Sequence, residues 1–412
     1  MPEFLRLLPP AEALARWLSA LPPERTPAVE RLPTSEALDR VLAAPVVPPE
    51  PLPAFARSTV DGYAVRASDT YGANPGLPAY LTLVGEVAMG AAPALRLEVG
   101  QAALVHAGGM IPAGADAVVM LEDTQLAREG EIEVLKPAPM GQNVIQAGED
   151  VKPGEVAIEA GKRLRPQEIG GLMALGVTSV EVARKPRVAV LSSGDEVVPP
   201  EVQPEPGQVR DVNSYSLAAL VQRAGGEPVR YGILPDRLQA LLEAARRAHA
   251  ESDLVILTAG SSVSARDLTA KVVDGLGRPG VVVHGVAVKP GKPTILAVCD
   301  GVPVVGLPGN PVSALVIAGL FVVPVLRRLL GQRSPELSPT VMARLAVNVP
   351  SEAGREDCLP VRLQMTPEGL QAEPIYGRSN LIFTLVRAVG LVRIPAEATG
   401  LPAGSRVEVA LF

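Results

Sequence analysis

The sequence predicts a multidomain protein that combines α/β and β architecture. A chain of 412 residues is longer than a single hydrophobic core normally supports, which predicts two to four domains. Apolar strand-like runs alternate with helical runs between residues 186 and 258, a pattern typical of a mainly parallel sheet covered by helices. Short Val- and Leu-rich segments broken by Gly and Pro occupy residues 79–164 and 332–412, and these segments predict β domains.

Two short helices and a linker are predicted near the N-terminus. Residues 9–20 and 34–43 have helical patterns, and Thr34 or Ser35 is placed to cap the second helix. The proline-rich segment 45–53 is expected to be a stiff linker. Strands of the β-rich region are then predicted in "YLTLVGEV", "AALVHAGG", "DAVVML" and "IEVL".

A return to helical periodicity indicates that the β-rich region is an insertion. The segment "RPQEIGGLMALG" (165–176) carries Leu172, Met173 and Leu175 at helical spacing and ends on Gly. Because β-rich material lies between helical pieces, the first domain is predicted to be a discontinuous helical and linker domain. The predicted boundaries are 1–50 plus 150–183 for the discontinuous domain and 51–149 for the β-rich inserted domain.

The α/β domain is predicted to span residues 184–331, followed by a small C-terminal β domain at 332–412. Its strands are expected in "PRVAVL", "EPVRYGIL" and "DLVIL", and its helices in "SYSLAALVQRAGG" and "DRLQALLEAARRAH". Leu238, Leu241, Leu242 and Ala245 fall on one face of the second helix. The glycine pair at 225–226 ends the first helix.

Composition excludes several classes of protein. Lys and Arg number 38 and Asp and Glu number 44, for a net charge of −6 without a basic run, so no nucleic-acid partner is expected. The longest apolar run has 15 residues and contains a Pro, which is shorter than the ~20 residues that span a bilayer. With no signal-peptide pattern at the start, we expect a cytoplasmic protein that does not bind membranes.

Cysteine and histidine usage does not predict a disulfide framework or a zinc site. Cys299 and Cys358 are far apart and no CxxC pattern occurs. His106, His249 and His284 are scattered and lack ligand spacing, so each is expected to be structural or incidental.

Four loops of the α/β region have distinctive chemistry. They are "SSGDEV" (192–197), "TAGSSVSARD" (258–267), "KPGKP" (289–293) and "LPGNPVSAL" (307–315), each expected to follow a strand. Ligands of open α/β sheets bind beyond the carboxyl ends of the strands, where such loops lie. Gly- and Ser-rich turns present backbone N–H groups to anions, and Asn310 is placed to cap a helix that starts with Pro311. Because neither GxxxxGK[ST] nor GxGxxG occurs, the loops predict an anion site that is neither a Walker ATPase nor a dinucleotide site.

Each loop has a plainer interpretation that the sequence leaves open. A Gly- and Pro-containing loop is often only a connector, and Lys289 and Lys292 are also compatible with solvated surface charge. The prolines and the glycine beside these lysines fix the backbone, which favours lysines that are aimed at a ligand. Asp195 and Asp267 are compatible with turn formation, which is the favoured role for Glu196. Carboxylates facing lysines also suit a Mg²⁺-assisted reaction on a phosphate anhydride.

Seven segments, in order, resemble the signature blocks of the MoeA family of molybdopterin molybdenumtransferases, which includes the C-terminal domain of gephyrin. They are "STVDGYAVR" (58–66), "MIPAGADAVVMLED" (110–123), "GEDVKPGEV" (148–156), "VAVLSSGDEVV" (188–198), "GSSVSARDLT" (260–269), "VKPGKPTI" (288–295) and "GLPGNPVSAL" (306–315). The resemblance implies an elongated subunit with a MogA-like three-layer α/β domain, working as a homodimer. It implies Mg²⁺-dependent insertion of molybdate into adenylylated molybdopterin, giving molybdenum cofactor and AMP. A MogA-type adenylyltransferase and molybdoenzyme maturation proteins are further partners that it suggests.

The resemblance also implies roles for individual residues. The expected catalytic residues, which handle the metal or the pterin, are Asp61, Glu122, Asp150, Asp195 and Asp267, and the last two are assigned to Mg²⁺. The residues expected to bind adenylylated molybdopterin or molybdate are Gly260, Ser261, Ser262, Lys289, Lys292, Pro308, Gly309, Asn310, Ser313, Arg355 and Ser379. On this basis Lys289 and Lys292 clamp an oxyanion.

The chain departs from the family pattern at several positions, which are Val60, Ala107, Ala259, Ser264 and Asn380. The block before Gly148 reads "NVIQA" and lacks the usual arginine, so an anion-binding donor is missing. Ala and Ser in place of Gly restrict turns. A non-catalytic paralogue that binds or delivers the cofactor is therefore the second hypothesis. A scaffold role like that of gephyrin is disfavoured, because no fused MogA-like domain or long linker is present.

Overall fold

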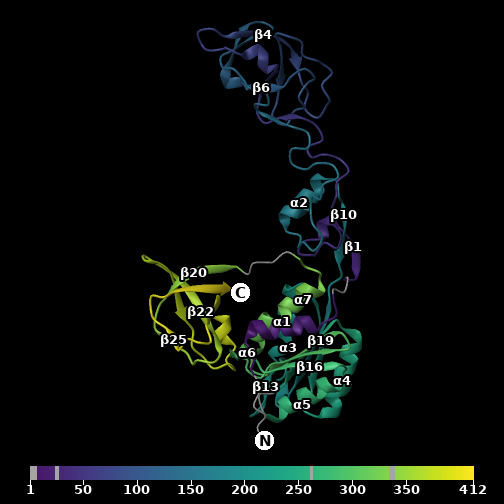
Figure 1. Ribbon diagram of the computed structural model, residues 1–412, viewed down its shortest axis with the longest axis vertical. Coiled ribbons are helices and arrows are strands. Elements are labelled where there is room, and N and C mark those ends of the chain that lie inside the picture. The colour runs from purple at the N-terminus through teal and green to yellow at the C-terminus, as the bar shows by residue number, and fades with distance from the viewer. Residues whose placement is uncertain (1–6, 24–26, 260–262, 334–338) are drawn as a thin grey trace.

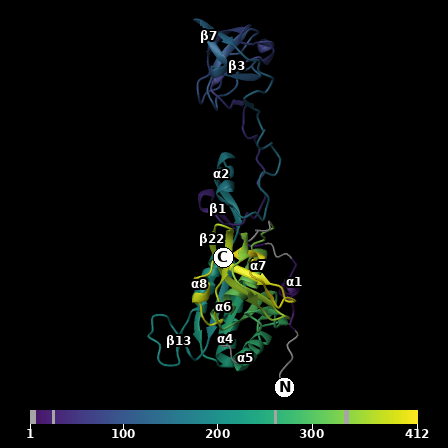
Figure 2. The same cartoon turned by 90° about the vertical axis from the view of Figure 1, so that its left-hand side faces the viewer.

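The computed structural model describes residues 7–23, 27–259, 263–333 and 339–412, and of residues 263–267 only the backbone. The subunit is elongated (Figures 1 and 2). The α/β domain and the C-terminal domain lie at one end, a small module with α2 lies between, and a β domain forms the opposite tip. The predicted multidomain α/β and β class is confirmed.

The α/β domain is built on a mixed six-stranded sheet. In spatial order its strands are β14 (Glu227–Leu234), β11 (Arg187–Ser193), β15 (Leu254–Ala259), β19 (Val302–Pro308), β18 (Ile295–Cys299) and β16 (Pro279–His284). The first four run parallel, whereas β18 is antiparallel to both of its neighbours. The prediction of a mainly parallel sheet is confirmed, and the carboxyl ends of β11, β15 and β19 meet at one edge.

Helices cover both faces of this sheet and make three layers. One face buries a cluster with α1 (Pro10–Ala20), α3 (Asn213–Arg223), α6 (Pro311–Ile317) and α7 (Val323–Leu329). The other face packs against α4 (Leu238–Glu251) and α5 (Val263–Asp274). The helices predicted at 214–226 and 236–249 are confirmed as α3 and α4, since apolar residues repeat at helical spacing in both.

Helix α1 belongs to this α/β core. The indole of Trp17 is fully buried, and its Nε1 donates a hydrogen bond to the carbonyl oxygen of Ala297 in β18 at 2.7 Å. Residues 1–50 were expected to belong to the discontinuous domain, but α1 packs against the α/β domain instead. The partner of Trp17 lies 280 positions along the chain, so no local pattern reveals the contact.

The helical stretch Pro311–Leu329 has 19 residues and is, within the part of the chain that the structure describes, the one helix long and apolar enough to span a membrane. Its most apolar window is 56% buried inside the protein. The stretch packs into the core under the sheet, with Phe321 and Val325 fully buried.

The middle module joins the two predicted pieces of the discontinuous domain. β1 (Val29–Pro33) pairs antiparallel with β10 (Ser179–Ala183), and α2 (Pro166–Ala174) lies beside them. The helix predicted at 34–43 is wrong, because only a 3₁₀ turn forms at Thr34–Glu36. The Thr34 hydroxyl donates to the carbonyl of Val177 at 2.6 Å instead of capping a helix. The N–H of Asp39 bonds Leu164, so the backbone partners come from the distant half of the module.

Glu168 fastens the first turn of α2. Its Oε2 accepts the backbone N–H of Arg165 at 2.9 Å and its Oε1 accepts Arg165 Nη2 at 2.7 Å. The hydrogen bond from the Arg165 side chain lowers the pKa of this buried carboxyl from 4.5 to about 2. Because the pKa is depressed in the folded state, the stabilisation is present above the unfolded pKa and is lost as pH falls from 4.5 towards 2.

We expect Glu168→Gln to destabilise α2 by roughly 1.5–3 kcal/mol at neutral pH, the range for hydrogen bonds to charged groups. Hydrogen exchange of the peptide that contains α2 measures this loss. The difference from wild type should shrink between pH 4.5 and 2, because wild type loses the same interaction there. Glu98→Gln, on an exposed side chain, is the control. A difference that stays constant across this pH range contradicts the assignment.

Two chain segments connect the middle module to the tip. Residues 45–53 run antiparallel to residues 146–158, with isolated bridges at Val46–Ile158 and Leu52–Val151. The short pair β2 (Arg57–Ser58) and β9 (Val144–Ile145) begins the tip domain. Its six-stranded sheet has the order β6 (Ala117–Met120), β3 (Gly62–Val65), β5 (Gln101–Val105), β4 (Ala79–Glu86), β8 (Glu131–Val134) and β7 (Thr124–Arg128). This confirms the predicted β-rich character of the region.

The C-terminal domain is a small barrel. β22 (Glu356–Thr366), β23 (Gly369–Pro374), β20 (Thr340–Leu345), β26 (Arg406–Leu411) and β24 (Gly390–Ile394) pair in this order, and β24 closes the ring by pairing with β22. The two-residue strand β17 (Val288–Lys289) leaves the α/β domain and adds to β22. Smaller pieces are β12 (Val197–Val198) with β13 (Val209–Arg210), β21 (Val349–Pro350) with β25 (Gly400–Leu401), and α8 (Phe383–Val386).

Candidate functional site

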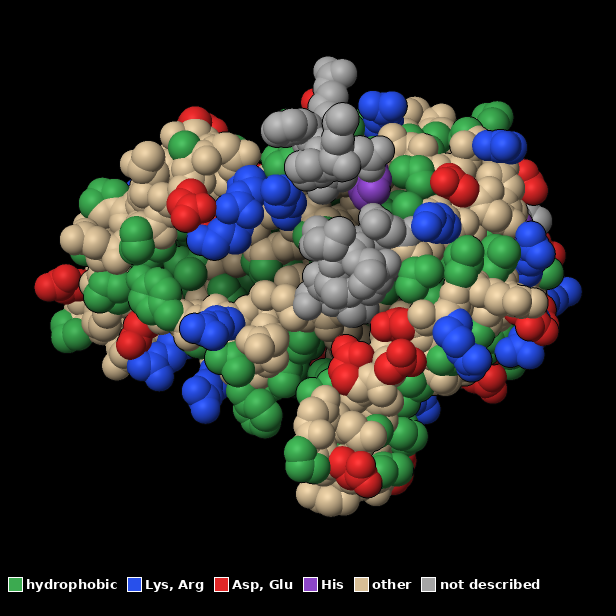
Figure 3. Space-filling view, turned by 90° about the horizontal axis from the view of Figure 1, so that it is seen from below, with side chains coloured by type: hydrophobic (Ala, Val, Ile, Leu, Met, Phe, Trp, Pro, Cys, Tyr) green, Lys and Arg blue, Asp and Glu red, His purple; other side chains and the backbone are tan. Residues whose placement is uncertain are grey.

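A cleft of about 690 Å³ lies between the α/β domain and the C-terminal barrel. Its walls are the "KPGKP" loop, the start of α6, the first half of β22, and residues 375–380. Seen from this end of the molecule, Lys and Arg side chains gather around a hollow between the two lobes (Figure 3). The cleft is therefore an interdomain site with a basic rim.

The charged residues of the cleft wall are mostly cationic. Among the described residues they are Lys289, Lys292, Arg355 and Arg378, opposed by Asp357. Lys289 Nζ lies 3.1 Å from Asp357 Oδ2, and that oxygen also accepts the Ser351 hydroxyl at 3.2 Å. Asp357 is 8% exposed, so its charge is neutralised mainly by Lys289. An excess of cations in a partly enclosed cleft favours a polyvalent anion.

The backbone of the lysine loop is held in one shape. Gly291 has φ +127°, and a Cβ there would lie 2.4 Å from the side chain of Ile317, so only Gly fits. The Thr294 hydroxyl donates to the carbonyl of Gly291 at 2.6 Å. The expectation that these lysines follow a strand of the α/β sheet is wrong, because Lys289 pairs with Asp357 in the barrel. The loop nevertheless leads into β18 at the edge where β19 ends, since the two strands are antiparallel.

A second cavity of about 320 Å³ continues the cleft along the sheet edge. It is lined by Ser192, Ser193, Glu196, Val197, Val209, Arg210, Asp211, Val212, Asn213, Thr258, Gly309 and Pro311, and it shares Ala259, Asn310 and Asn380 with the first cavity. These residues lie at or beyond the carboxyl ends of β11, β15 and β19, where an open sheet is expected to bind its ligand. The site therefore has a basic end and a hydroxyl- and amide-rich end.

Asn310 joins the two ends of the cleft. It precedes α6, as predicted, but its Nδ2 donates to the Ser379 hydroxyl at 2.9 Å rather than its side chain capping the helix. The carbonyl of Ser379 accepts the N–H of Val312 at 3.0 Å. Of the predicted binding residues, the cleft brings together Lys289, Lys292, Pro308, Gly309, Asn310, Ser313, Arg355 and Ser379. Gly260, Ser261 and Ser262 lie outside the described residues.

Sequence reasoning identified the loops of the amide-rich end that follow β11, β15 and β19, but it missed the contribution of Asp211 and Asn213. Buried Asp211 accepts the N–H of Ser214 at 3.0 Å and the Ser192 hydroxyl at 3.2 Å. Ser193 Oγ and Asn213 Oδ1 are buried without a hydrogen-bond partner among the described residues. Buried polar groups normally have partners, so this wall is suited to a polar ligand. The signal was an Asp-x-Asn-Ser stretch directly before a helical pattern.

Of the two predicted Mg²⁺ ligands, Asp195 and Asp267, the structure describes the side chain of Asp195 alone. Asp195 is exposed in the turn after β11, and its Oδ1 accepts the N–H of Asp236 at 3.2 Å. The Asp267 side chain is outside the described part of the chain. Among the described residues no group of three His, Cys, Asp or Glu side chains is arranged so that it could hold a metal ion. Mg²⁺ commonly takes one or two carboxylates and fills its shell with water and substrate phosphate, and an exposed Asp195 fits that mode.

The other predicted acidic residues lie in or next to the tip domain. Asp61 and Glu122 are exposed, and the carbonyl of Asp61 accepts the N–H of Leu121 beside Glu122 at 3.4 Å. Asp150 is exposed where the linker begins, with its N–H bonded to Leu52 at 3.1 Å. The tip and the cleft are at opposite ends of one subunit (Figure 1). A single subunit therefore does not bring Asp61, Glu122 or Asp150 to the cleft.

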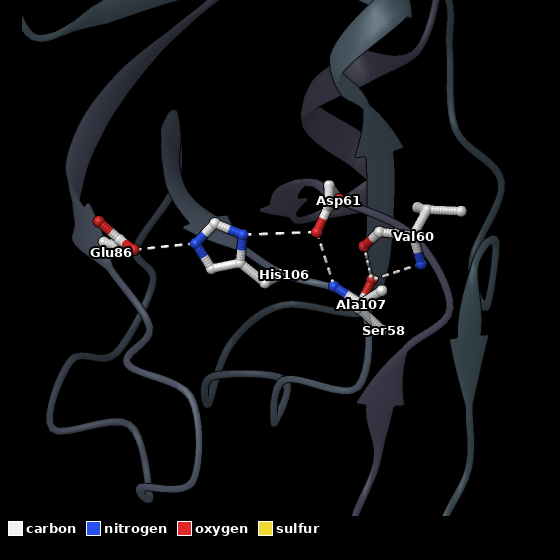
Figure 4. Close-up of polar contacts among 6 residues, drawn as sticks. All are labelled: Ser58, Val60, Asp61, Glu86, His106 and Ala107. Atoms are coloured by element: carbon white, nitrogen blue, oxygen red, sulfur yellow. Dashed lines mark hydrogen bonds and ion pairs between the residues drawn. The ribbon is translucent and has the colours of Figure 1, made fainter.

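His106 has a structural contact, which is one of the two outcomes expected from the sequence. Its ring lies between the carboxylates of Asp61 and Glu86 (Figure 4). The Nδ1–Asp61 Oδ1 distance is 3.4 Å and the Nε2–Glu86 Oε1 distance is 2.9 Å. The hydrogen bond to Glu86, followed by that to Asp61, raises the pKa of His106 above its ordinary value. Sequence spacing hid this group because its members come from three separate segments.

Two of the departures from the family pattern lie in the cleft. Ala259 and Asn380 line both cavities. In the tip, Ala107 donates its backbone N–H to Asp61 Oδ1 at 2.9 Å, and Val60 bonds through its backbone to the Ser58 hydroxyl (Figure 4). The side chain of Ser264 is outside the described residues.

Comparison with known proteins gives a consistent result along the chain. Residues 8–176 match the MoeA N-terminal region (domain I and II), residues 189–328 a probable molybdopterin binding domain, and residues 342–412 the MoeA C-terminal region (domain IV). The molybdopterin molybdenumtransferase of Haemophilus influenzae is 32% identical over 406 residues, which cover 97% of this chain and 98% of that protein. The enzyme of the same name from a Nostoc species is 34% identical, over 90% of this chain and 86% of its own length. A crystal structure of the molybdopterin biosynthesis moeA protein from Pyrococcus horikoshii superposes with a TM-score of 0.86 at 33% identity, covering 99% of this chain and 100% of that chain.

Proposed function

Because the chain belongs to the MoeA family, we infer that it is a molybdopterin molybdenumtransferase, an enzyme of molybdenum cofactor biosynthesis that inserts molybdenum into molybdopterin. The observation that carries this function is the continuous cleft with a basic end and a hydroxyl- and amide-rich end. Such a cleft suits two ligands held side by side: a compact oxyanion and a larger polar molecule that carries phosphate.

Molybdate is proposed to bind at the basic end. It is a dianion whose oxygens accept hydrogen bonds, and ammonium and guanidinium groups are the donors that make the strongest such bonds. Lys292 and Arg355 line this end, together with Lys289, which Asp357 holds at 3.1 Å. The hydroxyls of Ser313 and Ser379 add neutral donors to the same wall. The residues expected from the family resemblance therefore supply a suitable set of partners.

Adenylylated molybdopterin is proposed to lie along the amide-rich end. Ser193 Oγ and Asn213 Oδ1, which are buried without a hydrogen-bond partner in the described part of the chain, are available to a polar ligand. Asn310, which lines both cavities, is placed between this molecule and the oxyanion. The two substrates would then meet beside Asn310, which aligns them before any bond changes.

Mg²⁺ is proposed to bind near Asp195, jointly with a phosphate of the substrate. When bound, the cation would neutralise charge on the phosphate anhydride. The carboxylate of Asp195 is exposed at the sheet edge and would contribute a hard oxygen ligand. The backbone N–H of Asp236 holds one of its oxygens at 3.2 Å and so orients the group.

A homodimer is proposed because the predicted acidic residues lie at both ends of the subunit. In a two-fold dimer the tip of one subunit can reach the cleft of its partner. Asp61, Glu86 and Glu122 give the tip an acidic surface, and the cleft has a basic rim, so the two surfaces are electrostatically complementary.

A cytoplasmic location and the delivery of substrate by a MogA-type adenylyltransferase are also proposed. Cys299 and Cys358 are free and buried, which suits a reducing compartment. Release of the finished cofactor to molybdoenzyme maturation proteins is proposed as the next step. No nucleic acid or membrane is part of this proposal.

The proposed reaction is tested by incubating the purified chain with adenylylated molybdopterin, molybdate and Mg²⁺. We expect AMP release together with molybdenum bound to the pterin. Omitting molybdate or Mg²⁺ separately shows which of them the reaction needs. Tight binding of the pterin without AMP release would instead favour a non-catalytic paralogue that binds or delivers the cofactor.

In the same assay, Asp195→Asn should weaken the Mg²⁺ dependence more than it weakens folding. The substitution keeps the size of the side chain but removes the charge that the cation prefers. Since Asp195 is exposed, its loss should leave the unfolding temperature nearly unchanged. The measurement is AMP release as a function of Mg²⁺ concentration, with Asp236→Asn as the neighbouring control. A large fall in the unfolding temperature with unchanged Mg²⁺ dependence would show that Asp195 is structural.

A further inference from the structure

The tip domain holds a polar group that the proposed reaction does not yet use. His106 lies between Asp61, which immediately precedes β3, and Glu86, at the end of β4 (Figure 4). Both ring nitrogens face carboxylate oxygens, at 3.4 Å for Asp61 and 2.9 Å for Glu86. Nε2 is hydrogen-bonded to Glu86 and Nδ1 lies at ion-pair distance from Asp61, an arrangement that favours the protonated ring. The raised pKa of His106 agrees with this charge state.

The backbone around Asp61 is fixed without the help of this ring. The N–H of Ser58 bonds Gly109 at 2.9 Å and the N–H of Gly108 bonds Ser58 at 2.8 Å, which ties the two loops together. The Ser58 hydroxyl accepts the N–H of Val60 at 3.2 Å. Gly62 then enters β3, which is paired on both sides. Removal of the His106 ring should therefore leave the path of the chain intact.

The orientation of the Asp61 carboxylate, in contrast to the backbone, depends on the ring of His106. The Asp61 side chain is 58% exposed, and its Oδ1 has two partners, the N–H of Ala107 at 2.9 Å and His106 Nδ1. Ala107 offers only its backbone, so the ring of His106 is the side-chain donor of this group. Glu86 binds the opposite edge of the ring and limits its rotation.

We propose that His106 is a positioning residue that orients the Asp61 carboxylate for the molybdenum-transfer reaction, with Glu86 holding the ring. The inference rests on the proposed function, in which Asp61 of one subunit enters the cleft of its partner. His106 itself does not contact substrate in this arrangement. Its role is to reduce the conformational freedom of an exposed carboxylate before it meets the ligand.

Three substitutions at His106 separate positioning from simple loss of a side chain. The amide nitrogen of Asn matches the place of Nδ1, whereas that of Gln matches the place of Nε2. His106→Asn therefore keeps a donor for Asp61, and His106→Gln keeps one for Glu86 only. We expect kcat for AMP release to fall roughly 10- to 100-fold in His106→Ala and His106→Gln, the usual effect of losing an orienting partner. His106→Asn should recover most of this loss, and KM should change little in all three.

Glu86→Gln should have a smaller effect in the same direction, because it frees the ring but keeps the donor to Asp61. Glu98→Gln is the matched control, since it removes an exposed carboxylate of the same domain whose nearest cation, Arg96, is 3.9 Å away. Equal kcat values in His106→Ala and His106→Asn, or unchanged kcat in His106→Ala, would overturn the proposal.

An independent measurement needs no activity. The chain has three histidines, so the full-length protein labelled with ¹⁵N-histidine gives a simple spectrum, in which His106 is the signal lost in His106→Asn. We expect both ring nitrogens of His106 to stay protonated above the ordinary titration point of about 6.5. Asp61→Asn should lower that point.

The two measurements distinguish the failure of this proposal from failure of the proposed function. If the wild-type chain releases no AMP, the proposed function fails. The ¹⁵N-histidine spectrum then tests by itself whether His106 contacts Asp61. A signal that responds to Asp61→Asn then supports the His106–Asp61 contact. A His106 ring that titrates at the ordinary point, and is indifferent to Asp61→Asn, overturns it.

Discussion

Lys289→Ala and Lys292→Ala are each expected to weaken molybdate binding by about 10- to 100-fold. A charge-assisted hydrogen bond in a partly dehydrated cleft contributes roughly 1.5–3 kcal/mol, and about 1.4 kcal/mol corresponds to a factor of ten. Lys289→Ala should have the larger effect. It leaves Asp357, which is 8% exposed, without its cation, and that carboxylate then repels an incoming oxyanion.

The experiment compares the molybdate affinities of the Lys289 and Lys292 variants, which are expected to differ. Calorimetric titration of molybdate into wild type, both single variants and the double variant Lys289→Ala/Asp357→Asn measures the affinities. The double variant should bind more tightly than Lys289→Ala alone, because the unpaired buried charge has been removed. Lys152→Ala, on the exposed linker, is the control. Affinities equal within a factor of about two, or ~0.4 kcal/mol, would mean that the lysines are solvated surface charges.

Two inactive variants are expected to restore activity when they share a dimer. One chain carries Asp61→Asn in the tip, and the other carries Lys289→Ala/Lys292→Ala in the cleft. If the tip of one subunit completes the cleft of the other, the mixed dimer has one site with both lesions and one intact site. Co-expression with two affinity tags isolates this mixed dimer, and we expect about half of the wild-type rate of AMP release.

Each variant dimer purified alone is the control, and both should be nearly inactive. Two cleft variants, Lys292→Ala and Arg355→Ala, provide a matched pair that should not restore activity, because both lesions lie in the cleft. A mixed dimer as inactive as its parents would place the whole site within one subunit. Light scattering that finds only a monomer would contradict the dimer itself.

The parts of the fold that local patterns determine were predictable from sequence. The α3 and α4 helices follow from apolar spacing, and β11, β14 and β15 follow from apolar runs between turn residues. The false helix at 34–43 shows the limit of this reasoning, because Thr34 bonds Val177 in a segment that only the folded domain brings near. In the same way, Trp17 finds its partner 280 residues away.

The candidate site was predictable to a similar extent. The loops that carry Lys292 and Asn310 were identified because Gly and Pro punctuate the ends of strand patterns. The pairing of Lys289 with Asp357 was not, since a two-residue parallel bridge between domains has no periodicity. The group around His106 was missed because Glu86 lies 20 residues before it and the contact depends on how β4 and β5 are aligned.

The two-chain linker between the middle module and the tip has a mechanical consequence. A linker made of a single chain is flexible, and the domain at its far end can take many positions. A linker made of two segments that are bridged at Val46–Ile158 and Leu52–Val151 is stiffer and resists twisting. The tip domain then moves as one body with the linker, and a small bend where the linker joins the middle module displaces Asp61 by a larger distance. In the proposed dimer, the stiffness of the linker, rather than the affinity of the tip domain for the cleft, would determine how often Asp61 enters the partner's cleft in the correct orientation.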